Sequence, residues 1–339
     1  MKSSLCSVAV IQHPPVYLNL AKSVERACML IEEAASRGAD IIAFPETWLP
    51  GYPIWLDLSP GAALWDYPPA KAVFRILVQN SLKIPSPSLT KLLAAAHDAH
   101  AYVIMGAHEL KGHTLYNTMI FMGRDGTSYT LHRKLIPTYT ERMIWGRGDG
   151  STLKVFPTEV GGVGGLICWE HFMPLARAAM HAQYETIHVA QWPWAKELHH
   201  LASRHYAFEG QCFVLVAGCV LTRGELLTSV NALPGIDRER LDLLEDLPGS
   251  EKEYLLKGGS AVIAPDSSYV IDPRYDTPLI VHADIDLDCI LEGISTLDTS
   301  GHYARPDVFQ LKVDDSPQKD VIFSHEREKK SDVNSSQRQ

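Results

Sequence analysis

The sequence has no excess of positive charge and no long hydrophobic run. Its 339 residues carry 31 Lys and Arg against 40 Asp and Glu, which gives a net charge of −9. This balance offers no electrostatic basis for binding nucleic acid or an anionic membrane. No stretch approaches the ~20 apolar residues of a membrane-spanning helix. The N-terminal sequence MKSSLCSVAVIQHPP predicts a first strand rather than a signal peptide.

Cysteine is scarce and shows no pairing pattern. The cysteines are scattered and include no CxxC pair: Cys6, Cys28, Cys168, Cys212, Cys219 and Cys289. Such spacing excludes a disulfide framework and a cysteine-based zinc site. All but Cys168 lie in apolar runs typical of inert buried thiols. We therefore expect the protein to work in a reducing compartment, the cytoplasm.

Three histidines gather in the segment ELHHLASRH, at His199, His200 and His205. The interval between His200 and His205 does not match the i,i+4 spacing that places two metal ligands on one helix face. No cysteine or third-ligand motif flanks these residues. The segment therefore predicts a polar helix face, and we expect no metal.

Strand-like and helix-like segments alternate along the chain. Residues 23–38 have helical periodicity, residues 40–46 form an apolar strand pattern, and residues 114–134 predict a hairpin that turns at Asp125-Gly126. The alternation predicts an α/β fold in which helices cover the outer faces of sheets. We expect one domain over residues 5–313. Residues 222–256 are expected to form an excursion from the core, and residues 314–339 a disordered polar tail.

Three polar residues follow segments that predict strands. Glu46 follows IIAFP, Lys134 follows YTLHR, and Cys168 follows GGLI. Ends of strands are where α/β folds usually place their chemistry. Taken alone, a Glu or Lys at a strand end is more often solvated, and a Cys in an apolar run is more often part of the core. The unusual sequence around all three favours a shared site.

These surroundings resemble the motifs of the nitrilase branch of the carbon–nitrogen hydrolase superfamily. The resemblance lies in FPETWLPGYP, HRKLIPTYTERMIWGRGDG, GGLICWEHFMPLARAAM and HYARPDVF, and it extends from about Ser7 to Val313. It implies a four-layer αββα sandwich and a Glu-Lys-Cys triad. It also implies a homo-oligomer built from dimers that associate through helices, with no cofactor.

The resemblance assigns a role to each motif residue. Cys168 matches the nucleophile, Glu46 the general base, and Lys134 the cation that holds the reacting nitrogen and the oxyanion. Glu141, in YTERM, matches a second family carboxylate. The implied reaction converts a nitrile into a carboxylic acid and ammonia through a thioimidate and a thioester. We expect burial to raise the pKa of Glu46 toward neutrality and a nearby helix N-terminus to lower that of the Cys168 thiol.

Aromatic residues near the motifs predict a roomy apolar pocket. We expect Trp169, Trp192, Tyr52 and Trp55 to contact the substrate, with Trp192 as the best candidate for a wall. Such a pocket favours an aromatic, arylaceto- or medium aliphatic nitrile over free cyanide. His171 lies too close to Cys168 in sequence to act as its base, so we interpret it as a supporting residue.

Two other functions remain open. An amidase or a cyanide-converting enzyme would use the same four residues. A non-catalytic scaffold is a different class of protein, and the intact Glu46, Lys134, Glu141 and Cys168 argue against it. The expected partner is a small-molecule nitrile, and neither nucleic acid nor a membrane is expected to bind.

Overall fold

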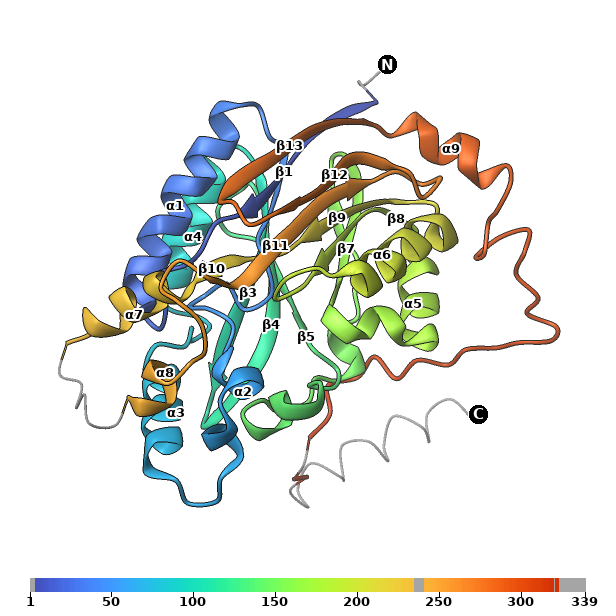
Figure 1. Ribbon diagram of the computed structural model, residues 1–339. Coiled ribbons are helices and arrows are strands. Elements are labelled where there is room, and N and C mark those ends of the chain that lie inside the picture. The colour runs from blue at the N-terminus through green and yellow to red at the C-terminus, as the bar shows by residue number, and fades with distance from the viewer. Residues whose placement is uncertain (1–3, 235–240, 320, 323–339) are drawn as a thin grey trace.

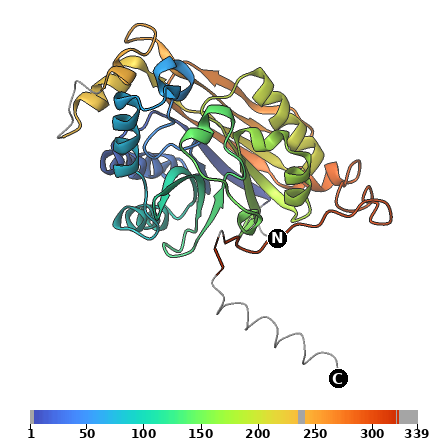
Figure 2. The same ribbon diagram turned by 90° about the horizontal axis from the view of Figure 1, so that it is seen from below.

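A computed structural model describes residues 4–234, 241–319 and 321–322. Two sheets pack face to face, and helices cover the outer face of each, so the layers are helix, sheet, sheet and helix (Figures 1 and 2). This arrangement confirms the predicted αββα sandwich. Within the described ranges, no helix has both the length and the apolar character needed to cross a membrane.

The first sheet has six strands. Their order is β13 (Leu279–Asp286), β1 (Leu5–Gln12), β2 (Ile41–Ala43), β3 (Tyr102–Lys111), β4 (Thr114–Met122) and β5 (Tyr129–Arg133). The three central strands β1, β2 and β3 are parallel, and the outer strands pair antiparallel. The predicted hairpin is present as β4 and β5.

The second sheet has seven strands. Their order is β10 (Val220–Thr222), β11 (Tyr254–Ile263), β9 (Phe213–Ala217), β8 (Glu185–Gln191), β7 (Gly161–Ile167) and β6 (Phe156–Thr158), and β12 (Tyr269–Tyr275) pairs with β11. Strands β7, β8 and β9 are parallel. Each sheet therefore has a parallel centre, and the candidate catalytic residues follow strands of both sheets.

The helices differ in which sheet they cover. On the side of the first sheet lie α1 (Leu20–Ser36) and α4 (Pro87–Asp98), which pack against each other; on the side of the second sheet lie α5 (Pro174–His181) and α6 (Glu197–Gly210). The remaining α-helices are α2 (Trp55–Leu58), α3 (Pro68–Gln79), α7 (Arg223–Asn231), α8 (Asp242–Glu245) and α9 (Asp288–Ile294). Single 3₁₀ turns are η1 (Pro60–Ala63), η2 (Tyr139–Met143), η3 (Gly150–Thr152) and η4 (Cys168–Phe172).

The strands are apolar on both faces because both faces are covered. On β1, Ala9 and Ile11 belong to the core beneath the helices, whereas Val8 and Val10 belong to the core between the sheets. Successive side chains of a strand point to opposite faces. A strand buried on both faces therefore reads as a continuous hydrophobic run.

The described residues bear on two predictions about the periphery. The described part of 222–256 is not an excursion from the core: it forms α7, α8 and the ends of β10 and β11, and it buries Leu226, Val230, Leu241, Leu243, Leu244 and Leu247. Because these apolar side chains are spaced irregularly among charged residues, the sequence shows no hydrophobic periodicity that would predict their burial. The predicted tail begins with residues 314–319, where the Gln318 N–H donates to Asp149 at 3.0 Å. Residue 320 and residues 323–339 lie outside the described residues.

Candidate active site

Glu46 lies three residues beyond the end of β2 and is buried. The segment around it passes very close to β3, where a Cβ on Gly106 would overlap the carbonyl oxygen of Pro45. Asn117 on β4 donates a hydrogen bond from Nδ2 to Oε1 of Glu46 at 2.7 Å. The second carboxylate oxygen, Oε2, is buried without a hydrogen-bond partner. Glu46 is thus held at one oxygen while the other stays available.

Lys134 follows the last residue of β5 and bridges two carboxylates. Its Nζ lies 2.9 Å from Oε1 of Glu46 and 2.7 Å from Oε2 of Glu141. Glu141 sits on η2, where its Oε2 also accepts the N–H of Thr138 at 2.7 Å and its Oε1 accepts the Tyr52 hydroxyl at 3.2 Å. These contacts are buried, so the Lys134 ammonium is held in place by its two charged neighbours.

Cys168 stands at a sharp turn between β7 and η4. Its φ is +55°, a left-handed conformation that is unusual for any residue other than glycine. The glycines of β7 precede its last two residues, and a Cβ on Gly164 would overlap Oε1 of Glu185 on β8. The sulfur of Cys168 and carboxylate oxygens of Glu46 and Glu141 all lie within 4.8 Å of one another.

Burial governs the proton equilibria of this cluster. Burial raises the pKa of Glu46 to about 7, against the opposing charge of Lys134, and nearby Glu141 raises it further. Burial and the charge of Glu46 raise the pKa of the Cys168 thiol well above its ordinary value. This corrects the expectation that a helix terminus lowers it, because Lys134 and the Trp169 N–H act in that direction but are outweighed. The resting cysteine is therefore a thiol that needs a base.

The cluster has the donors of a small metal site, but a cation already occupies its centre. Burial by itself would lower the pKa of Lys134, but Cys168, Glu46 and Glu141 raise it well above its ordinary value. The ammonium stays charged between the two carboxylates. A metal ion in the same position would have to displace it and overcome like-charge repulsion.

A cavity of about 200 Å³ opens onto Cys168. It is lined by Tyr52, Ile54, Asp57, Thr138, Tyr139, Thr140, Glu141, Cys168, Trp169, Pro193, Trp194, Lys196, His199 and Leu256. Two predicted pocket residues, Tyr52 and Trp169, are in this lining, and Trp169 keeps 45% of its surface exposed. The aromatic and aliphatic members form walls around the thiol, and Asp57 and Lys196 add opposite charges.

The other two predicted pocket residues lie elsewhere. Trp192 is fully buried and stacks on His171 and His199, with ring centres 4.8 and 4.4 Å apart. It therefore supports the wall from behind and is not part of the lining. Trp55 lines a different cavity, with Trp65 and Phe74. Trp192 and Trp55 are both buried in apolar packing, which sequence position alone does not reveal.

The clustered histidines occupy three different environments. His199 lines the Cys168 cavity, and His200 is buried with its ring 5.8 Å from that of Tyr269. His205 is largely exposed beside Glu209 on the same helix. His171 does not approach the thiol as a base. Its Nδ1 contacts the carbonyl oxygen of Cys168 at 2.7 Å, as the supporting role requires.

Sequence reasoning missed several residues of the site. Asn117 is a polar residue in the apolar strand sequence of β4, and that contrast was the available signal. Asp57 lies on α2, whereas Trp194 and Lys196 lie in the segment between β8 and α6, and only the fold brings these two segments to one cavity. Lys196 Nζ lies 4.6 Å from the centre of the Trp194 ring, a cation–π contact at the wall.

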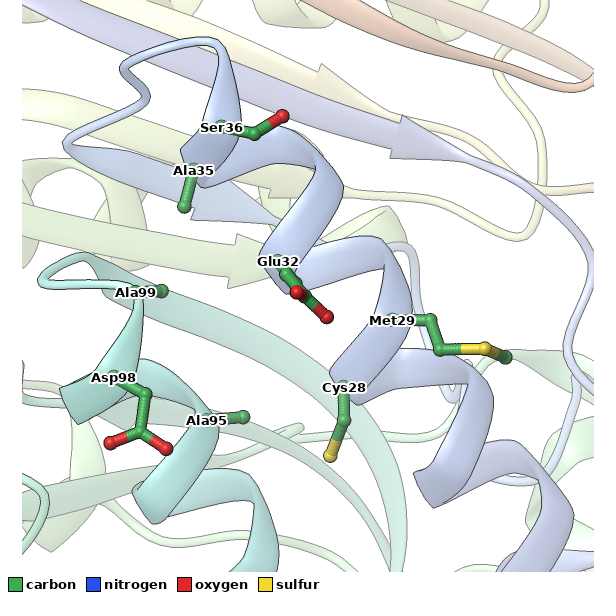
Figure 3. A pocket seen from close by; sticks show the side chains of 8 residues that line it. All are labelled: Cys28, Met29, Glu32, Ala35, Ser36, Ala95, Asp98 and Ala99. Carbon is green, nitrogen blue, oxygen red and sulfur yellow. The ribbon is translucent and has the colours of Figure 1, made fainter.

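A second cavity, of about 580 Å³, lies between α1 and α4, away from Cys168 (Figure 3). It is lined by Cys28, Met29, Glu32, Ala35, Ser36, Ala95, Asp98 and Ala99. Figure 3 shows the Cys28 side chain directed toward α4. Burial raises the pKa of this thiol, and no base contacts it among these lining residues, so the cavity lacks the chemistry of the Cys168 site.

Comparison with known proteins agrees with this geometry. Residues 7–292 match the family described as "Carbon-nitrogen hydrolase". The chain is 36% identical to an "Aliphatic nitrilase" of Sinorhizobium fredii, over 93% of this chain and 97% of the relative. It is also 36% identical to an "Arylacetonitrilase" of Aspergillus kawachii, over 94% and 95% of the two chains.

The fold comparison points the same way. The crystal structure of Saccharomyces cerevisiae Nit3, titled a member of branch 10 of the nitrilase superfamily, superposes with a TM-score of 0.63. The match covers 88% of this chain and 96% of that one, at 17% identity. The family match over most of the sequence and the similarity to two relatives over nearly their whole length establish that this chain belongs to the carbon–nitrogen hydrolase family.

Proposed function

We propose that this protein is a nitrilase that hydrolyses organic nitriles to carboxylic acids and ammonia. The observation that carries the proposal is the position of Cys168. Its thiol lines a cavity and lies within 4.8 Å of two buried carboxylates, with the Lys134 ammonium between them. A nucleophile, a base and a cation thus meet at one point. The nitrilase names of both relatives support the same reaction class.

The first half of the reaction forms a covalent intermediate. Cys168 adds to the nitrile carbon as Glu46 takes the thiol proton at its free oxygen, and Glu46 then passes this proton to the nitrile nitrogen. The product is a thioimidate, in which carbon is bonded to sulfur and doubly bonded to NH. Lys134 and the N–H of Trp169 both interact with Cys168, so both can stabilise the negative charge that develops beside it.

The second half of the reaction consumes two waters. The first water gives up a proton to Glu46 and adds to the thioimidate carbon, and Glu46 passes that proton to the nitrogen, which gives a tetrahedral species carrying OH, NH₂ and sulfur. Protonated nitrogen leaves as ammonia and a thioester remains. The second water releases the carboxylic acid and restores the thiol. Glu141 keeps Lys134 oriented through its 2.7 Å contact.

The cavity favours a nitrile with an apolar body. Trp169, Trp194, Ile54 and Leu256 line it. Each methylene of substrate buried against such walls contributes up to about 0.8 kcal/mol, a contribution that cyanide cannot gain. We therefore propose aromatic, arylaceto- and medium aliphatic nitriles as the substrate class.

We further propose a cytoplasmic homo-oligomer that assembles through α5 and α6. These helices expose large apolar side chains: Leu175, Leu198, Leu201 and Phe208. Such a patch favours association with a second copy of the chain. All six cysteines are free thiols, which supports a reducing compartment. Light scattering of wild type and Leu201→Glu tests the interface, since a charge at its centre should lower the oligomer mass.

Ammonia release from a panel of nitriles tests the proposed activity. The panel contains benzonitrile, phenylacetonitrile, a medium-chain aliphatic nitrile, cyanide and the matching amides, and Cys168→Ala is the control. Ammonia and acid from the organic nitriles support the proposal. Turnover of the amides alone would assign an amidase, and formamide from cyanide would assign a cyanide-converting enzyme. If the protein turns over none of these substrates, the result would favour the non-catalytic scaffold.

A further inference from the structure

A line of buried polar groups runs from the carbonyl of Cys168 through the second sheet. His171 Nδ1 lies 2.7 Å from the Cys168 carbonyl oxygen, and His171 Nε2 lies 3.0 Å from His188 Nε2. His188 Nδ1 lies 2.8 Å from Oε1 of Glu185, whose Oε2 accepts the hydroxyl of Tyr206. All five residues are buried, so each contact needs its own proton.

The Cys168 carbonyl oxygen, at one end of the line, determines which atom donates and which accepts in each hydrogen bond. A carbonyl oxygen can only accept, so His171 Nδ1 must donate to Cys168. In a neutral imidazole the other nitrogen then accepts, so His188 Nε2 donates to His171. His188 Nδ1 is left as an acceptor, and Oε1 of Glu185 must supply the proton. The geometry therefore requires a protonated Glu185 when both imidazoles are neutral.

The count of protons is independent of where each one resides. Three contacts join the Cys168 carbonyl, His171, His188 and Glu185, and each needs one proton. The two imidazoles bring one proton each when neutral, so the third must come from the acid or from a charged ring. When that proton is lost, two protons remain for three contacts. One contact then becomes two facing lone pairs.

Burial places the third proton on Glu185. Burial lowers the pKa of His171 to about 3 and lowers that of His188 well below its ordinary value. Burial raises the pKa of Glu185 to about 7, although His181 and the Tyr206 hydroxyl act in the opposite direction. The bond donated to His188 stabilises the neutral acid further. The line is therefore complete at low pH and loses a contact as pH rises past neutrality.

The line ends at the Cys168–Trp169 peptide, whose N–H is the proposed oxyanion donor. The carbonyl of Cys168 and the N–H of Trp169 belong to one planar unit. His171 holds the carbonyl end, and the N–H end interacts with the Cys168 sulfur. Because Cys168 has a left-handed φ of +55°, its backbone needs such support to keep this orientation. A loss of the His171 bond frees the peptide that carries the proposed oxyanion donor.

We propose that Glu185, His188 and His171 are positioning residues for the Cys168–Trp169 peptide, and that they act only while the Glu185–His188 pair holds its proton. The proposal rests on the proposed function in one respect, the role of Cys168 as nucleophile. None of the three side chains touches the substrate cavity. Their effect on turnover passes entirely through the backbone of Cys168.

The far end of the line, at Glu185, adjoins a cavity. A cavity of about 120 Å³ is lined by Glu185 and His181, and Nδ1 of His181 is buried without a hydrogen-bond partner. Other titratable groups face the line from each neighbouring element: His181 on α5, Tyr206 and Glu209 on α6, Cys212 before β9, Glu170 on η4, His132 on β5 and His199 on α6. Glu170 and His132 pair with each other, and Glu209 pairs with both Arg177 and His181.

The test compares Glu185→Gln with wild type across pH. A glutamine amide donates to His188 and its oxygen accepts from Tyr206, so the line stays complete at every pH. At about pH 6 the two enzymes should have similar kcat. The ratio of kcat, variant over wild type, should rise on the order of ten-fold toward pH 9, because only wild type loses its positioning. A ratio that stays flat, or that falls with pH, would overturn the proposal.

Two further variants separate positioning from general damage. Tyr206→Phe removes the donor that stabilises the Glu185 carboxylate, so the alkaline loss should move to higher pH without vanishing. Glu209→Gln removes a nearby carboxylate whose pKa is about 2, and its ratio to wild type should not change with pH. Shifts of equal size in all three variants would count against a specific role of Glu185.

An infrared experiment measures the proton without any turnover. Glu46 and Glu185 both have a pKa raised to about 7, so the difference spectrum of wild type between pH 6 and pH 9 should lose the carbonyl bands of two protonated carboxylic acids. In Glu185→Gln only the Glu46 band should remain; if both bands persist in the variant, the proton is not on Glu185 and the inference fails. An enzyme with the Glu185 band but without nitrile turnover would refute the proposed function alone.

Discussion

The side-chain amide of Asn117 donates a hydrogen bond to Oε1 of Glu46 at 2.7 Å, while Oε2 of the same buried carboxylate has no partner. One oxygen is fixed by Asn117 and Lys134, and the other can receive a proton. Asn117 also favours the charged form of Glu46, because its bond is made to the carboxylate. The amide therefore sets both the direction and the basicity of the proposed base.

Activity should fall on the acid side of neutrality. Burial raises the pKa of Glu46 to about 7, so below that pH the base becomes a neutral acid and cannot accept the thiol proton. Asn117→Ala removes a bond that lowers this pKa, so the acid limb of kcat/KM should move to higher pH. Gln12→Ala, which removes a buried amide bonded to Thr277 and Ser260 instead, should leave the limb in place. A limb that stays fixed in Asn117→Ala would contradict the role of this bond.

Cys168→Ala should abolish ammonia release while the protein remains folded. The covalent route disappears with the sulfur, so we expect a loss of at least about 10³-fold in kcat. Cys212→Ala is the matched control, because Cys212 is also buried but lies outside the cavity. It should cost about 1 kcal/mol of stability and little activity. Circular dichroism and ammonia release measure the two effects, and residual turnover by pure Cys168→Ala would refute the mechanism.

Lys134→Ala should damage both activity and stability. It leaves Glu46 and Glu141 facing each other in a buried site, which costs about 3–5 kcal/mol when both are charged. The pKa of Glu46, which burial already raises, loses the opposing effect of Lys134 and rises further above its unfolded value, so the penalty is small at low pH and grows as pH increases. The gap in Tm between wild type and variant should therefore widen from about pH 5 to pH 8. A constant gap would show that the carboxylates do not repel.

Glu141→Gln should affect turnover more than melting. The amide keeps the volume and one acceptor for Thr138 or Lys134 but removes the charge that orients the ammonium. We expect kcat to fall on the order of 10²-fold with a small change in Tm. Wild-type kinetics in this variant would reduce Glu141 to a structural residue of η2.

Trp194→Ala should change substrate preference, whereas Trp192→Ala should change stability. Trp194 lines the cavity, so its loss should change the ranking of kcat/KM between phenyl and alkyl nitriles. Trp192 is fully buried behind the wall, so its truncation should lower stability by about 3–5 kcal/mol with little change in ranking. Substrate panels and thermal melts on both variants check this. A changed ranking only in Trp192→Ala would reverse our assignment of the wall.

The sequence predicts the fold class and the four clustered residues because long motifs surround each of them. Glu46, Lys134 and Cys168 follow strand patterns, and Glu141 shares the motif of Lys134. Local sequence does not predict the burial of the aromatic residues, since Trp192 and Trp194 stand two positions apart and only Trp192 is fully buried. Glu185 and His188 lie on β8 and Tyr206 lies on α6, and no local pattern predicts that these side chains meet.

The missing side chain of Gly164 has a consequence for how this protein can change over evolutionary time. A Cβ at this position would overlap the Glu185 carboxylate. Alanine at position 164 therefore forces the Glu185 carboxylate to shift, which disturbs its contacts with His188 and Tyr206. A substitution at either position thus changes which residues the other position can accept. A library that randomises both positions should recover them as a linked pair rather than independently.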